Sequence, residues 1–143
     1  MRSIVSQVSL ALALVGILVL LGVFPHLQTV KSAGCSSSSL RGTYGWIGHG
    51  DKGGTPEAII GREIFDGAGF TYSDVTSSVG GKSNRDKFKG IYTINSDCAG
   101  TMIVAFPDNS RFHFDLVVVD GGLEVYWIIT DSGFTLSGIT KRM

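Results

Sequence analysis

Short segments in which apolar and polar residues alternate recur along most of the chain. In "RFHFDLVVV", which begins at Arg111, the even-numbered residues are apolar and the first odd-numbered ones are polar or charged. Alternation with this period is typical of a β-strand that buries one face. Turn-forming sequences such as "DKGG", "DGAG" and "PDNS" separate these segments at intervals of about ten to twelve residues. The pattern predicts antiparallel strands joined by tight turns.

This rhythm predicts eight strands, which we place at residues 40–49, 57–65, 69–77, 86–95, 100–106, 111–119, 122–130 and 134–142. In the seventh, "LEVYWII" is apolar on both faces, which favours a strand that is covered on each side. A meander of strands has unpaired edges unless the last strand pairs with the first, and closure removes those edges. We therefore expect an all-β fold, a closed eight-stranded antiparallel up-and-down barrel, in preference to a sandwich.

The sequence "GHGDKGG" at residues 48–54 fits the spacing G-x-G-x-x-G of dinucleotide-binding proteins. That spacing binds phosphate only between a strand and a helix of a parallel βαβ unit. The next segment, "TPEAIIGREIF", has a glycine where a helix would have its middle, and it fits a strand better. We interpret "GHGDKGG" as a flexible loop between the first two strands and exclude nucleotide binding.

The amino-terminal region has the pattern of an export signal. Residues 8–24 are continuously apolar, and Arg2 is the one charged residue before Lys31. We expect residues 1–32 to be a signal peptide that is cleaved before Ala33. A run of about 17 residues is near the lower limit for crossing a bilayer, so an uncleaved membrane anchor at 8–24 is the alternative.

Cleavage would divide the chain into the signal, a short serine-rich linker at 33–39 and one barrel domain at 40–143, exported to the periplasm or outside the cell. The whole chain has 12 basic and 12 acidic residues, so loss of Arg2 and Lys31 leaves 10 against 12, a net charge of −2. This balance argues against a nucleic-acid or anionic-membrane partner held by charge. Two cysteines and three scattered histidines give no metal-site spacing, and we expect no cofactor. The oligomeric state stays open.

Cys35 and Cys98 both follow the signal, in a compartment where oxidising conditions favour a disulfide. The sequence "SAGC" at residues 32–35 also fits a lipoprotein whose Cys35 is acylated, which would leave Cys98 unpaired. The two interpretations exclude each other.

The sequences "LRGTYGW", "FDGAG", "GIYTINSDCAGT" and "VVVDGG", in this order, resemble a group of small exported bacterial proteins. Those proteins are similar to the allene oxide cyclase type of eight-stranded barrel, a calycin-like relative of the lipocalins. The resemblance covers nearly all of the chain after the signal. It implies the closed barrel, and it implies the disulfide because such proteins carry cysteines at the positions of Cys35 and Cys98. It implies no catalytic residue, since barrels of this shape include both binding proteins and cyclases.

Large aromatic residues at alternating positions suggest a ligand-binding interior. An eight-stranded barrel is either filled by its side chains or just wide enough for one small ligand. The candidates for contacting a ligand are Tyr44, Trp46, Phe112, Phe114 and Trp127. We hypothesise that the protein binds a small apolar molecule in the barrel or at its mouth. The alternatives are a cyclase or isomerase that uses the cavity and a packed envelope module without a ligand.

Arg111, His113 and Asp115 share one strand face and are the candidate catalytic residues. The spacing of His113 and Asp115 would let the carboxylate orient the imidazole as a general base. The alternative interpretation is a solvated outer face. A polar cluster inside the barrel, either this one or Arg62 with Asp74, would favour an enzyme, whereas the scarcity of such groups favours a binding protein.

Overall fold

The structure is a computed structural model that describes residues 34–143. The expected signal peptide, its alternative as an anchor at 8–24, and Ala33 lie outside the described residues. No helix within 34–143 is both long enough and apolar enough to cross a membrane. The elements are η1 (Ser37–Ser39), β1 (Arg41–Lys52), β2 (Thr55–Asp66), β3 (Phe70–Val79), β4 (Lys82–Ile94), β5 (Ala99–Ala105), β6 (Arg111–Val119), η2 (Asp120–Gly122), β7 (Glu124–Ile129) and β8 (Ser137–Arg142).

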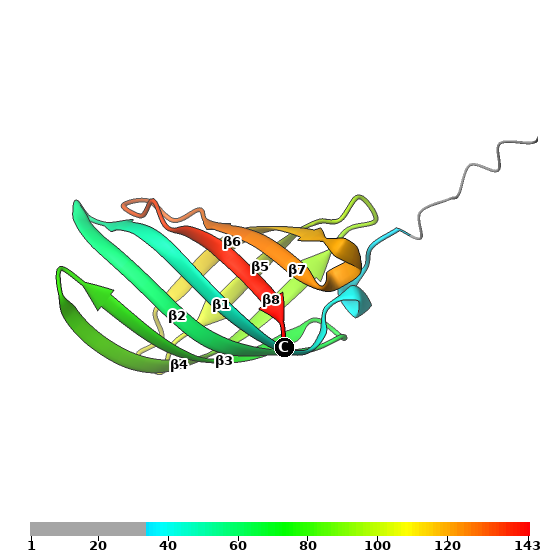
Figure 1. Ribbon diagram of the computed structural model, residues 1–143, viewed down its shortest axis with the longest axis horizontal. Coiled ribbons are helices and arrows are strands. Elements are labelled where there is room, and N and C mark those ends of the chain that lie inside the picture. Colours follow the sequence, from blue (N-terminus) through cyan, green and yellow to red (C-terminus); the bar gives the residue numbers. More distant parts are fainter. Residues whose placement is uncertain (1–33) are drawn as a thin grey trace, which may run out of the picture. The chain divides into compact units, whose positions relative to one another are not determined.

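The eight strands form one closed barrel in which each strand pairs with its neighbours in sequence (Figure 1). Closure comes from antiparallel pairing of β1 with β8, in which Ile47 lies opposite Ile139. Every other pairing is antiparallel too. The predicted eight-stranded antiparallel barrel is confirmed, and the described strands have no open sheet edge along their paired lengths.

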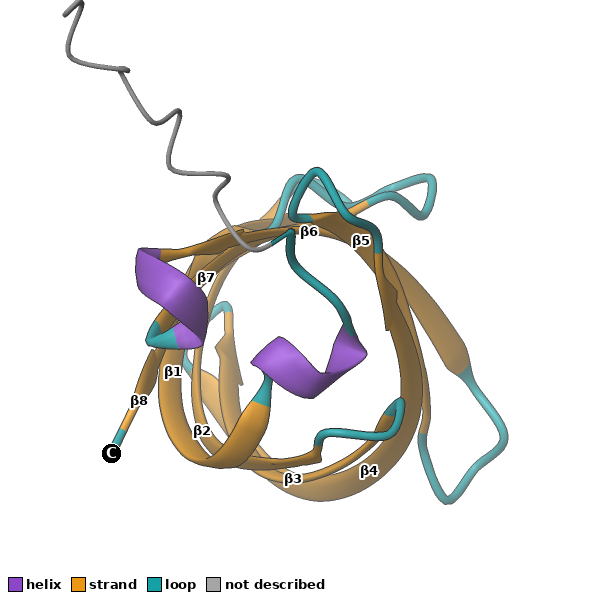
Figure 2. Cartoon of the chain, turned by 90° about the vertical axis from the view of Figure 1, so that its right-hand side faces the viewer, coloured by secondary structure: helices purple, strands orange, loops and turns teal. Residues whose placement is uncertain are grey.

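The two ends of the barrel differ. At one end lie the β1–β2 and β3–β4 turns and the loops at 106–110 and 130–136; we name it the hairpin end (Figure 1). At the other end, η1 lies across the barrel opening (Figure 2); we name it the plugged end. Leu40 follows η1 and is completely buried. The Tyr92 hydroxyl donates to the Leu40 carbonyl oxygen at 3.0 Å, which ties the plug to β4.

A disulfide joins Cys35 to Cys98, with their Cα atoms 4.9 Å apart. It fastens the segment before η1 to the turn between β4 and β5. The predicted disulfide is confirmed, and this pairing is incompatible with acylation of Cys35. The serine-rich stretch that we expected as a linker thus contains the plug of the barrel.

The interpretation of "GHGDKGG" as a flexible loop is wrong. β1 continues to Lys52, and the turn consists of Gly53 and Gly54 alone, both with positive φ (60° and 84°) as a two-residue type I′ hairpin requires. The glycines before the turn serve packing instead. A Cβ at Gly48 would overlap the Trp127 ring, and a Cβ at Gly50 would overlap the Thr135 carbonyl oxygen.

Gly138 in β8 has the same packing role, so we predict that Gly138→Ala destabilises the barrel. A Cβ there would overlap the Ile47 carbonyl oxygen and the Trp127 ring. Overpacking of this kind costs about 1–3 kcal/mol, and we expect the free energy of unfolding to fall by that amount in urea denaturation. Gly45→Ala is the control, because its Cβ would come no closer than 3.7 Å to Met143. An equal loss of stability in both variants would contradict the prediction.

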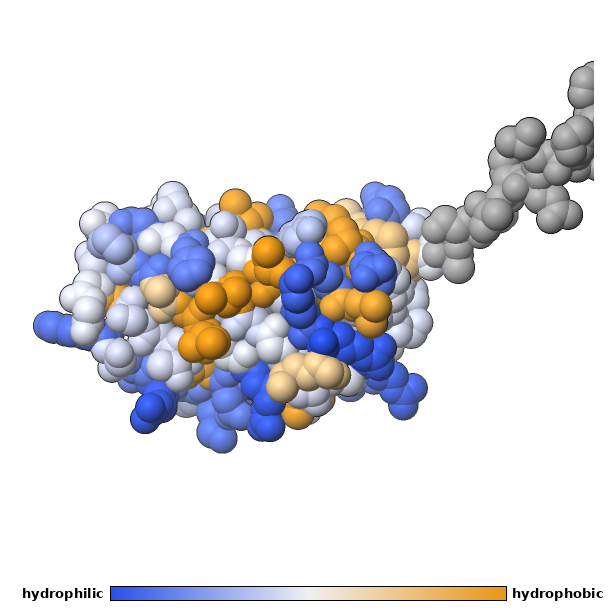
Figure 3. All heavy atoms as spheres, in the orientation of Figure 1, coloured by the Kyte–Doolittle hydropathy of each residue, from blue (hydrophilic) through white to orange (hydrophobic). Residues whose placement is uncertain are grey.

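The expectation that the seventh strand is covered on both faces is wrong. Tyr126 and Ile128 point outward and are 46% and 49% exposed. Tyr126 belongs to a row of outward apolar side chains that register places side by side across the barrel wall: Ile60, Ile47, Ile139, Tyr126 and Val117. Figure 3 shows apolar side chains gathered on this face.

Candidate functional site

A cavity of about 40 Å³ lies inside the barrel. Inward-facing side chains of every strand except β3 line it, which places it on the barrel axis. Its apolar walls are formed by Trp46, Ile59, Phe65, Phe88, Met102, Phe114, Leu116, Val125 and Trp127, and its polar lining residues are Glu63 and Thr140. One water needs at least about 10–15 Å³ of such space, so the cavity has room for a group of a few heavy atoms.

Aromatic rings form much of the cavity wall. The Trp127 ring packs edge to face against Trp46 at 5.9 Å and against Phe114 at 5.8 Å between centroids. Phe88 extends the wall, with its ring 6.4 Å from that of Trp46. Trp46, Phe114 and Trp127 are three of the residues expected to contact a ligand, and the structure brings these three together.

Glycines and one hydrogen bond fix the two tryptophans. Trp46 lies over Gly61 of β2, where a Cβ would overlap its ring, and its indole N–H donates to the Ser73 hydroxyl at 3.1 Å. Trp127 lies over Gly48 and Gly138 in the same way. The rings are therefore held by backbone that only glycine allows to come so close.

Glu63 is the charged residue that the sequence analysis missed. Its side chain points inward from β2 and the residue is 3% exposed. The Thr71 hydroxyl donates to Oε1 at 2.8 Å, and within residues 34–143 no hydrogen bond reaches Oε2. Burial raises the pKa of Glu63 to about 7, against a smaller lowering by the Thr71 hydrogen bond. The signal that could have revealed Glu63 is its spacing: it lies an even number of positions from Ile59 and Phe65, so all three side chains share one face of the strand.

A carboxyl group in this state can donate or accept a hydrogen bond near neutral pH. Its cross-strand neighbours in β1 and β3 are Tyr44 and Ser73, neither of which is a cation. Thr140 adds a hydroxyl to the same cavity. Within the described part of the chain no three His, Cys, Asp or Glu side chains gather in a way that would hold a metal ion.

The other two residues expected to contact a ligand lie nearer the barrel ends. Tyr44 is fully buried at the plugged end, where its hydroxyl donates to the Gly122 carbonyl oxygen at 2.6 Å. Phe112 lies at the hairpin end in a chain of aromatic contacts, 5.6 Å from Phe106 and 5.1 Å from Phe134. Phe106 in turn lies 5.5 Å from Phe88 of the cavity wall. We name Phe106, Phe112 and Phe134, all half-buried, the hairpin-end cluster.

Arg111, His113 and Asp115 point outward from β6 and are exposed. His113 Nδ1 lies 2.9 Å from Asp131 Oδ1, and its backbone N–H donates to the same carboxylate at 2.6 Å. The partner of the imidazole is thus Asp131 in the β7–β8 loop, a residue that sequence spacing did not indicate. The contact attaches this loop to β6, and the barrel cavity contains none of the three candidates.

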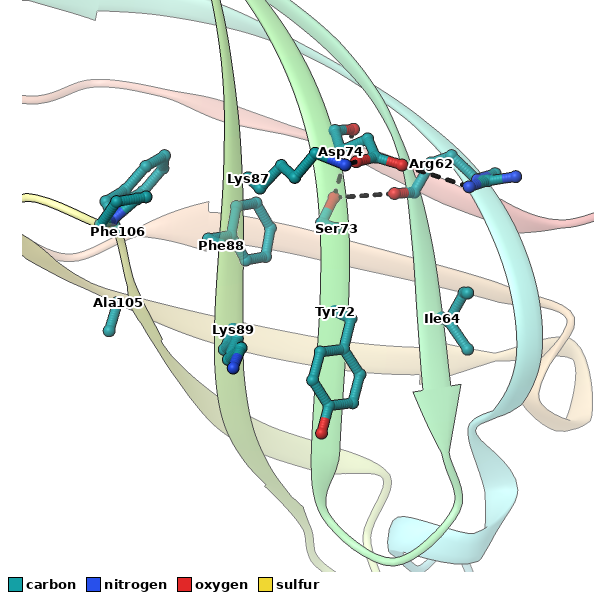
Figure 4. A pocket seen from close by; sticks show the side chains of 11 residues that line it. Arg62, Ile64, Tyr72, Ser73, Asp74, Lys87, Phe88, Lys89, Ala105 and Phe106 are labelled. Atoms are coloured by element: carbon teal, nitrogen blue, oxygen red, sulfur yellow. Dashed lines mark hydrogen bonds and ion pairs between the residues drawn. The ribbon is translucent and has the colours of Figure 1, made fainter.

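Arg62 and Asp74 also face outward, in a groove of about 550 Å³ over β2, β3 and β4 (Figure 4). Asp74 pairs with Lys87 at 3.0 Å and with Arg62 at 3.2 Å, and the hydrogen bond and charge of Lys87, followed by those of Arg62, lower its pKa. These side chains are about half exposed or more, so solvent screens the pairs. The groove is larger than the cavity, but three of its charged residues, Arg62, Asp74 and Lys87, pair with one another. The interior is therefore the stronger candidate site.

No family model matches the chain, and no curated protein matches it. Two solved structures are similar: a redesigned β-barrel (TM-score 0.59, 16% identity, 75% of this chain and 94% of that chain) and a de novo designed fluorescence-activating β-barrel (TM-score 0.54, 14% identity, 75% and 96%). Likeness at this identity shows the fold alone. It supports the barrel and says nothing of the resemblance to the allene oxide cyclase type.

Proposed function

We propose that this protein is an exported barrel that binds a small, mainly apolar ligand in its interior cavity. The observation that carries the proposal is an apolar cavity whose wall contains one buried carboxyl group, that of Glu63. Binding sites for small molecules are concave and apolar, with a few polar groups that fix the ligand's orientation. The disulfide is consistent with an oxidising compartment, which supports export. Kinship with the allene oxide cyclase type belongs to the same proposal.

The energetic cost of burying Glu63 supports binding over a packed structural module. A buried carboxyl group with a single protein hydrogen bond destabilises the folded state relative to an apolar side chain of similar volume. A barrel that served only as a rigid module would be more stable with leucine or methionine at this position. Binding of a ligand through the carboxyl group would account for the presence of Glu63 in the interior.

The ligand would enter at the hairpin end. η1, Leu40 and the disulfide close the plugged end. The hairpin-end cluster is half-buried and connects through Phe88 to the cavity wall. Entry then requires these rings to move, and rotations of partly exposed side chains are fast motions.

A second candidate function is catalysis of the cyclase or isomerase type. The pKa of Glu63 near 7 is the observation that favours it, because a general acid or base works best with a pKa near the working pH. A substrate held against the aromatic wall would receive or lose a proton at Oε2 of this residue.

The proposed function predicts that filling the cavity abolishes binding. Val125 lines the cavity and is 1% exposed, whereas Val117 points outward from β6. We expect xenon, a monatomic apolar probe, to shift the NMR signals of Trp46 and Trp127 in the wild type and in Val117→Phe, and to shift neither in Val125→Phe. A second measurement compares the native mass with the denatured mass of protein purified from the cell envelope of its own host. Extra mass that is lost on denaturation would reveal a retained ligand. If the wild type bound neither the probe nor a retained ligand, the proposed function would be wrong.

A further inference from the structure

The polar and aromatic groups of the cavity indicate which chemical class of ligand it selects. The aromatic residues Trp46, Phe88, Phe114 and Trp127 line a cavity that Glu63 lines as well. One carboxylate oxygen accepts the Thr71 hydrogen bond at 2.8 Å, and within residues 34–143 the other has no donor. The site therefore combines aromatic rings with a carboxylate oxygen that is available to a ligand.

This combination is complementary to a positive charge. The face of an aromatic ring is negative, and it attracts an ammonium group most strongly where water is excluded. A carboxylate buried without a counter-ion is unstable, and an opposite charge within hydrogen-bond reach offsets its lost hydration. A cationic group between Glu63 and the rings would satisfy both conditions, whereas a neutral apolar ligand would satisfy neither.

The described residues supply no such cation themselves. Arg62 and Lys87 pair with Asp74 on the outer surface, and Lys141 pairs with Glu124 there. Lys52 lies at the hairpin end, with its Nζ 5.7 Å from the centroid of the Phe134 ring. Within the described residues no Lys, Arg or His side chain lines the cavity, so a positive charge for Glu63 must come from a bound molecule.

We propose that the cavity binds a short primary alkylammonium ion, whose charged group pairs with Glu63 and whose hydrocarbon portion packs against Trp46 and Trp127. This inference rests on the function proposed above and names its ligand class. A volume of about 40 Å³ admits only a few heavy atoms, which favours a short primary amine over a bulky quaternary one. Thr140 also lines the cavity, and its hydroxyl is a second group able to accept an ammonium hydrogen.

The test compares ethylammonium with ethanol, which has the same hydrocarbon chain and no charge. We expect calorimetric titration at about pH 8 to show that the wild type binds the amine at least about tenfold more tightly than the alcohol. Glu63→Gln should bind both probes with similar affinity, because it keeps the shape of the cavity and loses its charge. Glu57→Gln is the matched control: Glu57 also points inward from β2, burial also raises its pKa, and its Oε2 is buried without a hydrogen-bond partner in the described part of the chain, but it lies toward the hairpin end and does not line the cavity.

The pH dependence separates this proposal from its alternative. Tyr44 from β1 and Ser73 from β3 are the side chains in register with Glu63, and burial raises the pKa of Tyr44 further from neutrality. Burial also raises the pKa of Glu57, so the same titration in Glu57→Gln isolates the contribution of Glu63, whose pKa is about 7. Affinity for the ammonium ion should rise from about pH 6 to about pH 8 in the wild type and stay constant in Glu63→Gln.

Stronger binding of ethanol than of the amine, weakening as pH rises, would overturn the inference. It would mean that protonated Glu63 donates to a neutral ligand, and the proposed binding function would stand. Failure of both probes and of xenon to bind the wild type would instead remove the binding function itself. Circular dichroism and thermal unfolding of Glu63→Gln establish that a lost preference does not reflect a misfolded barrel.

Discussion

Replacing both Cys35 and Cys98 with alanine is expected to lower the free energy of unfolding by about 2–4 kcal/mol. The two residues are 63 positions apart, so the disulfide closes a long loop and restricts the unfolded chain. It also fastens the plug: without it, η1 and Leu40 are held to the barrel by packing and by hydrogen bonds such as that from the Tyr92 hydroxyl. The loss should therefore come with easier opening of the plugged end.

Urea denaturation monitored by tryptophan fluorescence measures this loss, because both tryptophans are buried in the barrel. Reduction of the wild type with a thiol should reproduce the stability of the double variant. The same reductant should leave the double variant unchanged, which controls for other effects of the reagent. Coincident unfolding curves for the oxidised wild type and the variant would show that the disulfide contributes nothing.

The contribution of Glu63 to the stability of the wild type is expected to fall by about 3 kcal/mol as pH rises from about 4.5 to about 7. The pKa of this carboxyl group is raised by burial from 4.5 to about 7 in the folded protein. Between these values the folded state binds more protons than the unfolded state, so the folded state loses stability as pH increases. The stabilisation is fully present below pH 4.5 and is lost as pH rises through the folded pKa.

The measurement is the free energy of unfolding of the wild type minus that of Glu63→Gln across this pH range, which removes contributions that the two share. The difference should change by about 3 kcal/mol and then remain constant at higher pH. Glu124→Gln is the control, because Glu124 pairs with Lys141 at 2.8 Å on the outer surface and that hydrogen bond lowers its pKa. If the free energy of unfolding varied with pH in the same way in the wild type and in Glu63→Gln, Glu63 would have an ordinary pKa in the folded protein.

Much of the fold could be predicted because turns and alternation are local properties. Type I′ turns need positive φ at both positions, so pairs such as Gly53 and Gly54 mark hairpins whatever surrounds them. The same holds for the pair Gly80 and Gly81 between β3 and β4. Closure could be predicted as well, since an eight-strand meander has no other way to pair its first and last strands. The error at "GHGDKGG" arose because the sequence does not distinguish a glycine that is needed for close packing from a glycine that is needed for a turn.

The candidate site could be predicted only in part. The aromatic residues Trp46, Phe114 and Trp127 were identified because large side chains at alternating positions usually face the interior. Glu63 was missed because β2 has two apolar faces: Ile59 and Phe65 share one with Glu63, while Ile60 and Ile64 share the other with Arg62. Alternation with a period of two does not say which face is inside.

The sequence by itself determined the strands, their turns, the closed barrel and the cysteine pair, because these follow from backbone propensity, period and chain connectivity. The tertiary structure decided which face of each strand points inward. In β2 that choice follows from Trp46, which packs onto Gly61 inside the barrel. Glu63 lies two positions after Gly61 and therefore shares its inward face, whereas Arg62 points outward. The position of the carboxyl group in the cavity thus depends on a contact between Trp46 and Gly61, which are 15 positions apart, and no local pattern records that contact.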